Sequence, residues 1–181
     1  KKKKIIMRNY ILLIIIFFAF GFVYSQKFKG LDKSPLDMIQ FPGNRGESQW
    51  ARILYSRPQL NGRDISNLVP EGKVWRMGAN ESTELTLYLP MKIGGTSISK
   101  GSYTLYAIPF ENEMTLIINK ATNVWGAYSY KKELDVIRVK APLKEVEESL
   151  EAFSMIFDKE ESGMVLHMGW GNYRAAFSFK K

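Results

Sequence analysis

The residues best suited to binding chemistry lie between Tyr55 and Thr83, where glycine, proline and asparagine interrupt an otherwise regular pattern. Three arginines fall in this stretch, Arg57, Arg63 and Arg76. Guanidinium groups bind carboxylate, phosphate or sulfate through paired hydrogen bonds, so three arginines that converge would form an anion site. The alternative is a long loop whose arginines pair with nearby carboxylates and fasten the loop to the fold.

Three more residues complete the predicted ligand site. Trp75 would offer a stacking surface for a sugar or an aromatic ligand, and Asn80 and Thr83 would add orienting hydrogen bonds. The alternative for Trp75 is a place in the hydrophobic core. The predicted ligand-binding residues are therefore Arg57, Arg63, Trp75, Arg76, Asn80 and Thr83.

The chain has no recognisable catalytic signature, and we predict no catalytic residue, no metal site and no cofactor. Cysteine is absent, and His167 is the only histidine, whereas catalytic zinc usually needs two or three nitrogen ligands. No Gly-x-Ser-x-Gly motif is present to pair with that histidine. Carboxylate pairs near the tryptophan, Glu81 with Glu84 or Glu71 with Glu81, leave glycosidase-type hydrolysis open as an alternative.

The elements that must position these residues are strands, because apolar residues recur with a period of two from Trp50 onward. Turn signals such as Gly94-Gly95, typical of a compact hairpin, separate the strands at short intervals. Only Leu143 to Leu150 has a helical composition. The alternation is clearest in residues 85–89, 102–108, 114–118, 136–140, 153–157, 164–168 and 173–179.

This spacing predicts an all-β, single-domain antiparallel β-sandwich, jelly-roll-like, with a short helix and an N-terminal signal segment. We expect a signal peptide in residues 1–25, an N-terminal arm or loop in 26–49, and the sandwich domain in 50–181. Lys1 to Lys4 and Arg8 precede the apolar run from Ile11 to Phe22, the layout of a secretory signal peptide. Export to the periplasm or the exterior follows, with membrane contact only through an uncleaved leader.

A second aromatic cluster runs from Trp125 to Tyr130. It predicts a bent strand that packs its rings on the core, or alternatively an exposed strip for glycans. Arg138 alternates with Ile137 and Val139, so it points away from the core. It either joins the other arginines or pairs with a carboxylate on the surface.

Several of these motifs together resemble a known bacterial family of exported proteins, domain of unknown function 2911. The resemblance lies in the strings YSRP, GR, LVP, GKVWR and GAN-x-ST, followed by GSYTL, WGAY and DVIRV, over most of the chain after the leader. It implies export and a small, largely β domain. It implies no activity, cofactor or catalytic residue.

The charge balance excludes a nucleic-acid partner. The formal charge is +8, but without the leader the chain keeps 21 basic and 18 acidic residues. We therefore predict an exported protein that acts as a non-catalytic binding module for a small anionic or carbohydrate ligand, or for an envelope protein. The alternatives are a hydrolase acting on carbohydrate or ester substrates, and a purely structural or interaction module.

Overall fold

The computed structural model describes residues 2–7, 10, 25–44 and 46–181, and it divides into two units, 1–31 and 32–181. In the first unit, residues 2–7 and 10 are helical and residues 25–31 have no regular secondary structure. The apolar run predicted for the signal peptide lies outside the described residues. Among the helices that are described, none combines the length and the apolar character needed to span a membrane.

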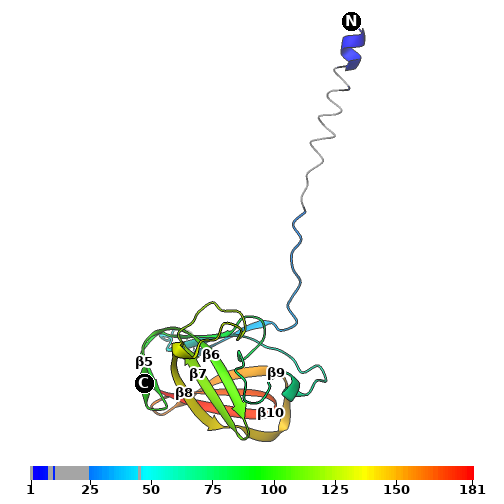
Figure 1. Cartoon of the computed structure of the whole chain (residues 1–181). Helices are drawn as coiled ribbons and strands as arrows, with labels where there is room; N and C mark the ends of the chain where they lie inside the picture. The colour runs from blue at the N-terminus through cyan, green and yellow to red at the C-terminus, as the bar shows by residue number, and fades with distance from the viewer. Residues whose placement is uncertain (1, 8–9, 11–24, 45) are drawn as a thin grey trace. The chain divides into compact units, whose positions relative to one another are not determined.

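The second unit is a β-sandwich of two antiparallel sheets, which confirms the predicted fold class (Figure 1). The larger sheet has the order β1-β2-β3-β6-β7-β8, and the smaller has the order β5-β4-β10-β9. The strands are β1 Leu36–Phe41, β2 Ala51–Ser56, β3 Thr83–Leu87, β4 Met91–Ile93, β5 Thr96–Ile98, β6 Gly101–Phe110, β7 Glu113–Asn119, β8 Asp135–Pro142, β9 Lys144–Glu160 and β10 Gly163–Lys180. Two 3-10 helices, η1 Ile65–Asn67 and η2 Lys132–Leu134, lie in connections.

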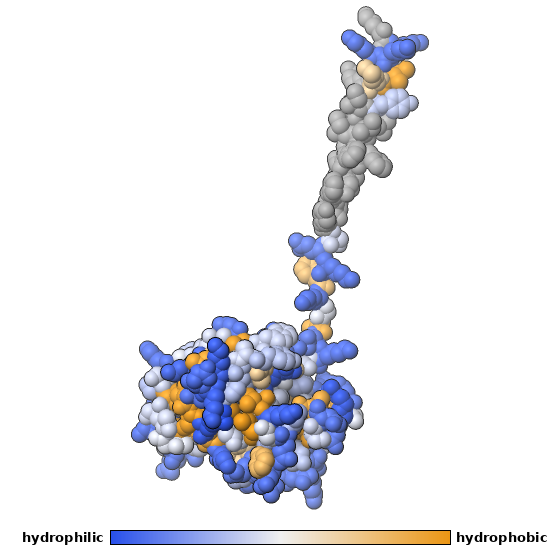
Figure 2. Space-filling view, in the orientation of Figure 1, coloured by the Kyte–Doolittle hydropathy of each residue, from blue (hydrophilic) through white to orange (hydrophobic). Residues whose placement is uncertain are grey.

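The core lies between the sheets and follows the period of two. On the central strands β6 and β7, Leu105 pairs with Ile118 and Ala107 pairs with Leu116, and all four side chains are buried. The space-filling view shows hydrophobic side chains in the middle of the domain's visible face, with hydrophilic ones around them (Figure 2). Apolar side chains therefore reach the surface on this side of the sandwich.

Strand β1 lies in the segment that we expected to be a loop or arm. It pairs with β2 in a continuous register from Leu36↔Ser56 to Phe41↔Ala51. Ile39 and Phe41 pack inward, whereas Leu36 is exposed. Because this edge strand carries apolar residues on both faces between prolines and glycines, its alternation is weak in the sequence.

The predicted helix at Leu143 to Leu150 is wrong, because this segment begins the long strand β9. The glutamates there have good helix propensity, but pairing with β10 outweighs local preference. Register pairs Tyr173↔Glu145 and Arg174↔Lys144 hold the strand. Around the register shifts, side chains complete the pairing: Asn172 donates to the carbonyls of Val146 and Glu147, and Arg174 donates to that of Glu148.

The last two predicted strands are one strand, β10, interrupted by bulges. Register shifts fall between Gly169 and Gly171 and between Gly171 and Tyr173. Gly171 has φ +53°, a left-handed conformation that glycine adopts without a side-chain clash. Before the bulges the buried side chains of β10 are at even-numbered positions, the last of them Trp170, and after the bulges they are at odd-numbered positions, beginning with Ala175. The bulges thus change which residues of β10 point into the core.

Candidate functional site

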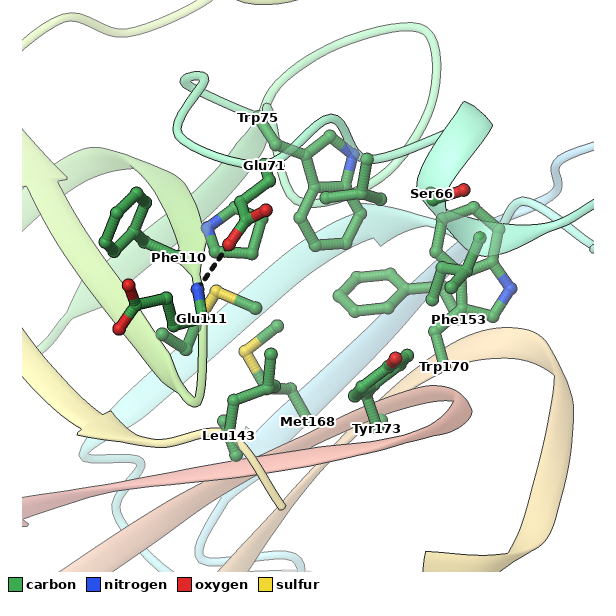
Figure 3. A pocket seen from close by; sticks show the side chains of 16 residues that line it. Ser66, Glu71, Trp75, Phe110, Glu111, Leu143, Phe153, Met168, Trp170 and Tyr173 are labelled. Carbon is green, nitrogen blue, oxygen red and sulfur yellow. Dashed lines mark hydrogen bonds between the residues drawn. The ribbon is translucent and has the colours of Figure 1, made fainter. Parts of the chain in front are cut away.

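A pocket of about 230 Å³ lies where the two sheets meet the irregular loop and the β6–β7 turn. Most of its wall is aromatic or aliphatic (Figure 3). The lining residues are Ile65, Ser66, Val69, Glu71, Trp75, Pro109, Phe110, Glu111, Met114, Leu143, Phe153, Met168, Gly169, Trp170, Tyr173 and Ala175.

Trp75 is held in the pocket wall by the backbone of β6. Its N–H donates to the Ala107 carbonyl at 2.7 Å, and the Ala107 N–H donates back at 2.9 Å. Trp75 therefore continues the sheet past Thr83, the first residue of β3. It lies opposite Ala107, whose small side chain leaves room for the indole ring. Residues opposite one another in an antiparallel pair share a face, so the ring points into the sandwich.

Two aromatic side chains from the smaller sheet meet Trp75. The Trp170 ring stacks on it with centroids 5.9 Å apart and planes 17° apart, and the Phe153 ring meets it edge-on at 4.9 Å. Phe153 is fully buried and Trp170 nearly so. The Trp170 indole N–H donates to the Glu151 carbonyl at 3.1 Å, which fixes the ring beside the β10 bulge. These three residues, Trp75, Phe153 and Trp170, are called the aromatic trio below.

Two glutamates, Glu71 and Glu111, lie at the side of the pocket opposite Phe153 and Trp170 (Figure 3). The Glu71 carboxylate accepts a hydrogen bond from the Glu111 backbone N–H at 2.5 Å. The Gly72 N–H donates to the Pro109 carbonyl at 2.7 Å, which joins the irregular loop to the β6–β7 turn. Glu111 has φ +51° at this turn, and both glutamates are exposed at the rim. The lining residues include no lysine, arginine or histidine.

The three arginines of the predicted anion site lie apart from this pocket, and each has local partners. Arg57 forms an ion pair with Asp37 at 3.1 Å. The same guanidinium donates to the Phe153 carbonyl at 3.1 Å and to the Ser154 hydroxyl at 2.7 Å. Arg57 therefore joins β1 of the larger sheet to β9 of the smaller one.

Arg63 and Arg76 bond to their own loop. Arg63 donates to the carbonyls of Leu60 at 2.8 Å and Gln59 at 2.6 Å, and it is exposed. Arg76 donates through Nε to the Gly78 carbonyl at 3.3 Å. Neither lines the pocket. The guanidinium groups of Arg63 and Arg76 therefore stabilise two separate turns of the irregular loop.

Asn80 and Thr83 also lie outside the pocket. The Asn80 side-chain amide donates to Asp32 at 3.1 Å, and Asn80 itself has φ +57°. The Thr83 hydroxyl is buried and donates to the Met77 carbonyl at 2.6 Å. Of the six predicted ligand-binding residues, Trp75 is the one that lines the pocket.

The carboxylate pairs that would support hydrolysis are not brought together at the pocket. Glu71 lies at its rim, whereas Glu81 forms an isolated bridge with Trp125 and Glu84 is on β3 opposite Thr104. His167 faces away from the core and lies 3.3 Å from Asp158. The site therefore offers neither proposed carboxylate pair.

Arg138 and the second aromatic cluster form a separate structure on the outer face of the larger sheet. Arg138 pairs with Asp135 at 2.8 Å, and Tyr130 donates to that carboxylate at 2.6 Å. Burial, with the Asp135 hydrogen bond, raises the pKa of Tyr130 to about 12. Trp125 forms an isolated bridge with Glu81, Tyr128 lies in a turn, and both are exposed, so these two rings do not pack in the core as a bent strand would.

Sequence reasoning missed the pocket residues that lie outside the irregular loop. Phe153 and Trp170 looked like ordinary alternating core residues, and Glu111 like part of a turn. One signal was available for Trp170: it lies inside Gly169-Trp170-Gly171, and two glycines around a tryptophan in a strand are typical of a bulge. Within the described residues, no group of three or more His, Asp or Glu side chains could hold a metal ion.

The chain belongs to the family described as "Protein of unknown function (DUF2911)", whose model matches residues 34–179. This match confirms the resemblance seen in the sequence, and it covers the strands of the sandwich except for the last residue of β10. No curated protein and no solved structure matches the chain. Function must therefore be argued from the site itself.

Proposed function

We propose that this protein is a non-catalytic binding module that holds a small ligand with a flat, partly apolar ring in the pocket between its sheets. The observation that supports this most directly is the aromatic trio, which two sheets and the irregular loop bring together at an open pocket. Concave sites lined by aromatic side chains with a few polar groups are the usual form of small-molecule sites. The pocket also argues against a purely structural module, which would need none.

The size of the pocket limits the ligand to one or two rings. An apolar cavity of about 150 Å³ is large enough to take benzene. The pocket here, at about 230 Å³, has room for one sugar ring, a substituted benzene or an indole. The same space would admit one aromatic side chain of an envelope protein.

The charge of the pocket argues against the anionic ligand that the sequence suggested. Glu71 and Glu111 are the charged lining residues, and the three arginines make their hydrogen bonds elsewhere. An anion placed beside two carboxylates would be repelled. The candidates that remain are carbohydrates, which stack their apolar face on tryptophan, and uncharged or cationic aromatic molecules.

Thermal denaturation with a panel of monosaccharides and small aromatic compounds tests this function. A ligand present at a hundred times its Kd stabilises the folded state by about 2.7 kcal/mol. For a domain of this size, that corresponds to an increase of about 5–10 °C in Tm. A panel that spans neutral, cationic and anionic rings and leaves Tm unchanged throughout would contradict the proposal.

Tyr173 and Tyr88 provide a matched pair of variants for the same assay. Tyr173 lines the pocket and is 37% exposed, whereas Tyr88 is 43% exposed and lies outside the pocket. We expect Tyr173→Ala to weaken binding about tenfold by removing one wall, and Tyr88→Ala to leave it unchanged. Equal effects of the two substitutions would place the ligand elsewhere.

We further propose that the protein is exported. The support is the basic head and apolar run in residues 1–25, with an apolar stretch of about 12 residues, shorter than the roughly 20 that span a bilayer. Expression of the full chain in a Gram-negative host, followed by fractionation and N-terminal sequencing, tests this. Recovery of the uncleaved chain in the cytosol would contradict export.

A further inference from the structure

We infer that the ligand of this pocket is a cation, a ring that bears an amine or another positive group. This inference rests on the proposed binding function and names the chemical class of the ligand. It follows from which charged groups line the pocket, from what they are bonded to, and from where they lie relative to the aromatic trio.

The pocket has an uncompensated negative side. Its lining residues include two carboxylates and no basic side chain. Among the ion pairs of the described residues, none involves Glu71 or Glu111. Glu113 shows the contrast, because it lies two residues farther along the same hairpin and pairs with Lys140 at 2.7 Å. The two rim carboxylates are thus placed as acceptors for a positive charge that no described residue of the chain provides.

Glu71 is fixed in place by the fold. One of its oxygens accepts the Glu111 N–H, so the carboxylate is tied to the β6–β7 turn and keeps its second oxygen for another donor. The Glu111 side chain leaves the same turn on the side away from the trio (Figure 3). An ammonium group in the pocket would therefore have the fixed Glu71 carboxylate as its acceptor, and Glu111 would add attraction at longer range.

Phe153 and Trp170 lie across the cavity from Glu71 and Glu111, whereas Trp75 lies beside Glu71 (Figure 3). A ring seated against Trp75, the half-buried member of the trio, would therefore place a short substituent near Glu71. The faces of tryptophan rings attract cations as well, and carboxylates next to apolar walls act through a lower effective dielectric than they would in water. Both effects favour a cationic ligand over a neutral one of the same shape.

Three probes of nearly equal size test the inference by calorimetric titration: phenethylamine, phenethyl alcohol and 3-phenylpropionate. At neutral pH they present the same ring with a positive, neutral or negative end. We expect phenethylamine to bind about fivefold more tightly than the alcohol, and the propionate to bind most weakly. The preference should shrink as the salt concentration rises, because the rim is exposed to solvent.

Charge-removing variants locate the preference. Glu71→Gln keeps the carbonyl oxygen that accepts the Glu111 N–H, and Glu111→Gln changes a side chain with no ion pair, so both should fold. We expect each substitution to reduce the preference for the amine over the alcohol, while the control Glu113→Gln leaves it unchanged. Circular dichroism and Tm confirm folding of each variant before titration.

The outcomes separate this inference from the function on which it rests. If the three probes bind with equal affinity, the pocket binds rings but the cationic class is overturned. If the amine preference survives Glu71→Gln and Glu111→Gln together, the carboxylates do not produce it and the inference is again overturned. If no probe binds, and the wider ring panel also leaves Tm unchanged, the binding function itself fails.

Discussion

Replacement of Arg57 by methionine tests whether this arginine joins the sheets, as its contacts indicate, or recognises an anion. Methionine keeps the apolar stem and removes the guanidinium. The lost interactions are the ion pair with Asp37 and the hydrogen bonds to the Phe153 carbonyl and the Ser154 hydroxyl. Because both ion-pair partners are more than a third exposed, that pair contributes only about 0.5 kcal/mol.

The two hydrogen bonds to β9 contribute more. A hydrogen bond donated by a charged group is worth about 1.5–3 kcal/mol when buried, and about half that value suits these partly exposed contacts. We therefore expect Arg57→Met to lower the free energy of unfolding by about 2–3.5 kcal/mol. For a domain of about 150 residues, Tm should fall by roughly 4–14 °C.

Arg63→Met is the matched control for thermal and urea denaturation. Arg63 is exposed and donates only to carbonyls of its own loop, so its loss should change stability by no more than about 0.5 kcal/mol. The reasoning would be refuted if Arg57→Met left Tm unchanged while abolishing binding of a ring ligand. In that case the guanidinium would serve recognition and not the joint between the sheets.

Three further predictions concern the packing around the site and the outer face. Phe153→Ala should lower the free energy of unfolding by about 3–5 kcal/mol in urea, because Phe153 is fully buried between Trp75 and Trp170; a loss below 1 kcal/mol would contradict its place in the core. The free energy of unfolding should fall as the pH rises from about 10 to about 12. In this range a tyrosine in the unfolded chain loses its proton near pH 10, whereas folded Tyr130 keeps its proton because its pKa is about 12. The folded state therefore binds more protons than the unfolded state, and a higher pH favours unfolding. Tyr130→Phe should make that fall less steep, and an unchanged slope would argue against it. Gly163→Ala should unfold the domain or lower Tm by more than 10 °C, since its Cβ would overlap the Phe179 carbonyl oxygen, whereas Gly43→Ala, with open space around it, should be neutral.

The sequence predicted the fold class because the strands with one buried face show clear alternation. Residues 85–89 and 114–118 have this pattern; residues 85–87 belong to β3, and residues 114–118 to β7. The prediction failed where tertiary pairing decides the structure. The segment 144–150 has a helical composition but pairs with β10, and β1 is an edge strand with apolar residues on both faces.

The candidate site could be predicted only in part. Trp75 was identified because it lies in an irregular loop, but its partners Phe153 and Trp170 lie about 80 and 95 residues away in regular strands. The arginines were grouped because they are close in sequence. Sequence proximity says little about where side chains point, and each of Arg57, Arg63 and Arg76 found carbonyl acceptors nearby.

The pocket exists because the regular strand ladders are interrupted at three places that lie close together. At the first, Trp75 pairs with β6 as a single residue outside β3; at the second, β10 bulges at Gly171. At the third, the chain after β2 crosses to β9, where Gln59 pairs with Ala152. At each place the freed backbone groups have new partners, among them the Trp75–Ala107 pair and the Leu60 N–H to the Glu151 carbonyl at 2.9 Å. A cavity whose walls are tied in this way needs little ordering when a ligand enters, so binding energy is not spent on arranging the aromatic trio. The arginines of the loop lie outside the pocket lining and make hydrogen bonds to carbonyl groups of the fold.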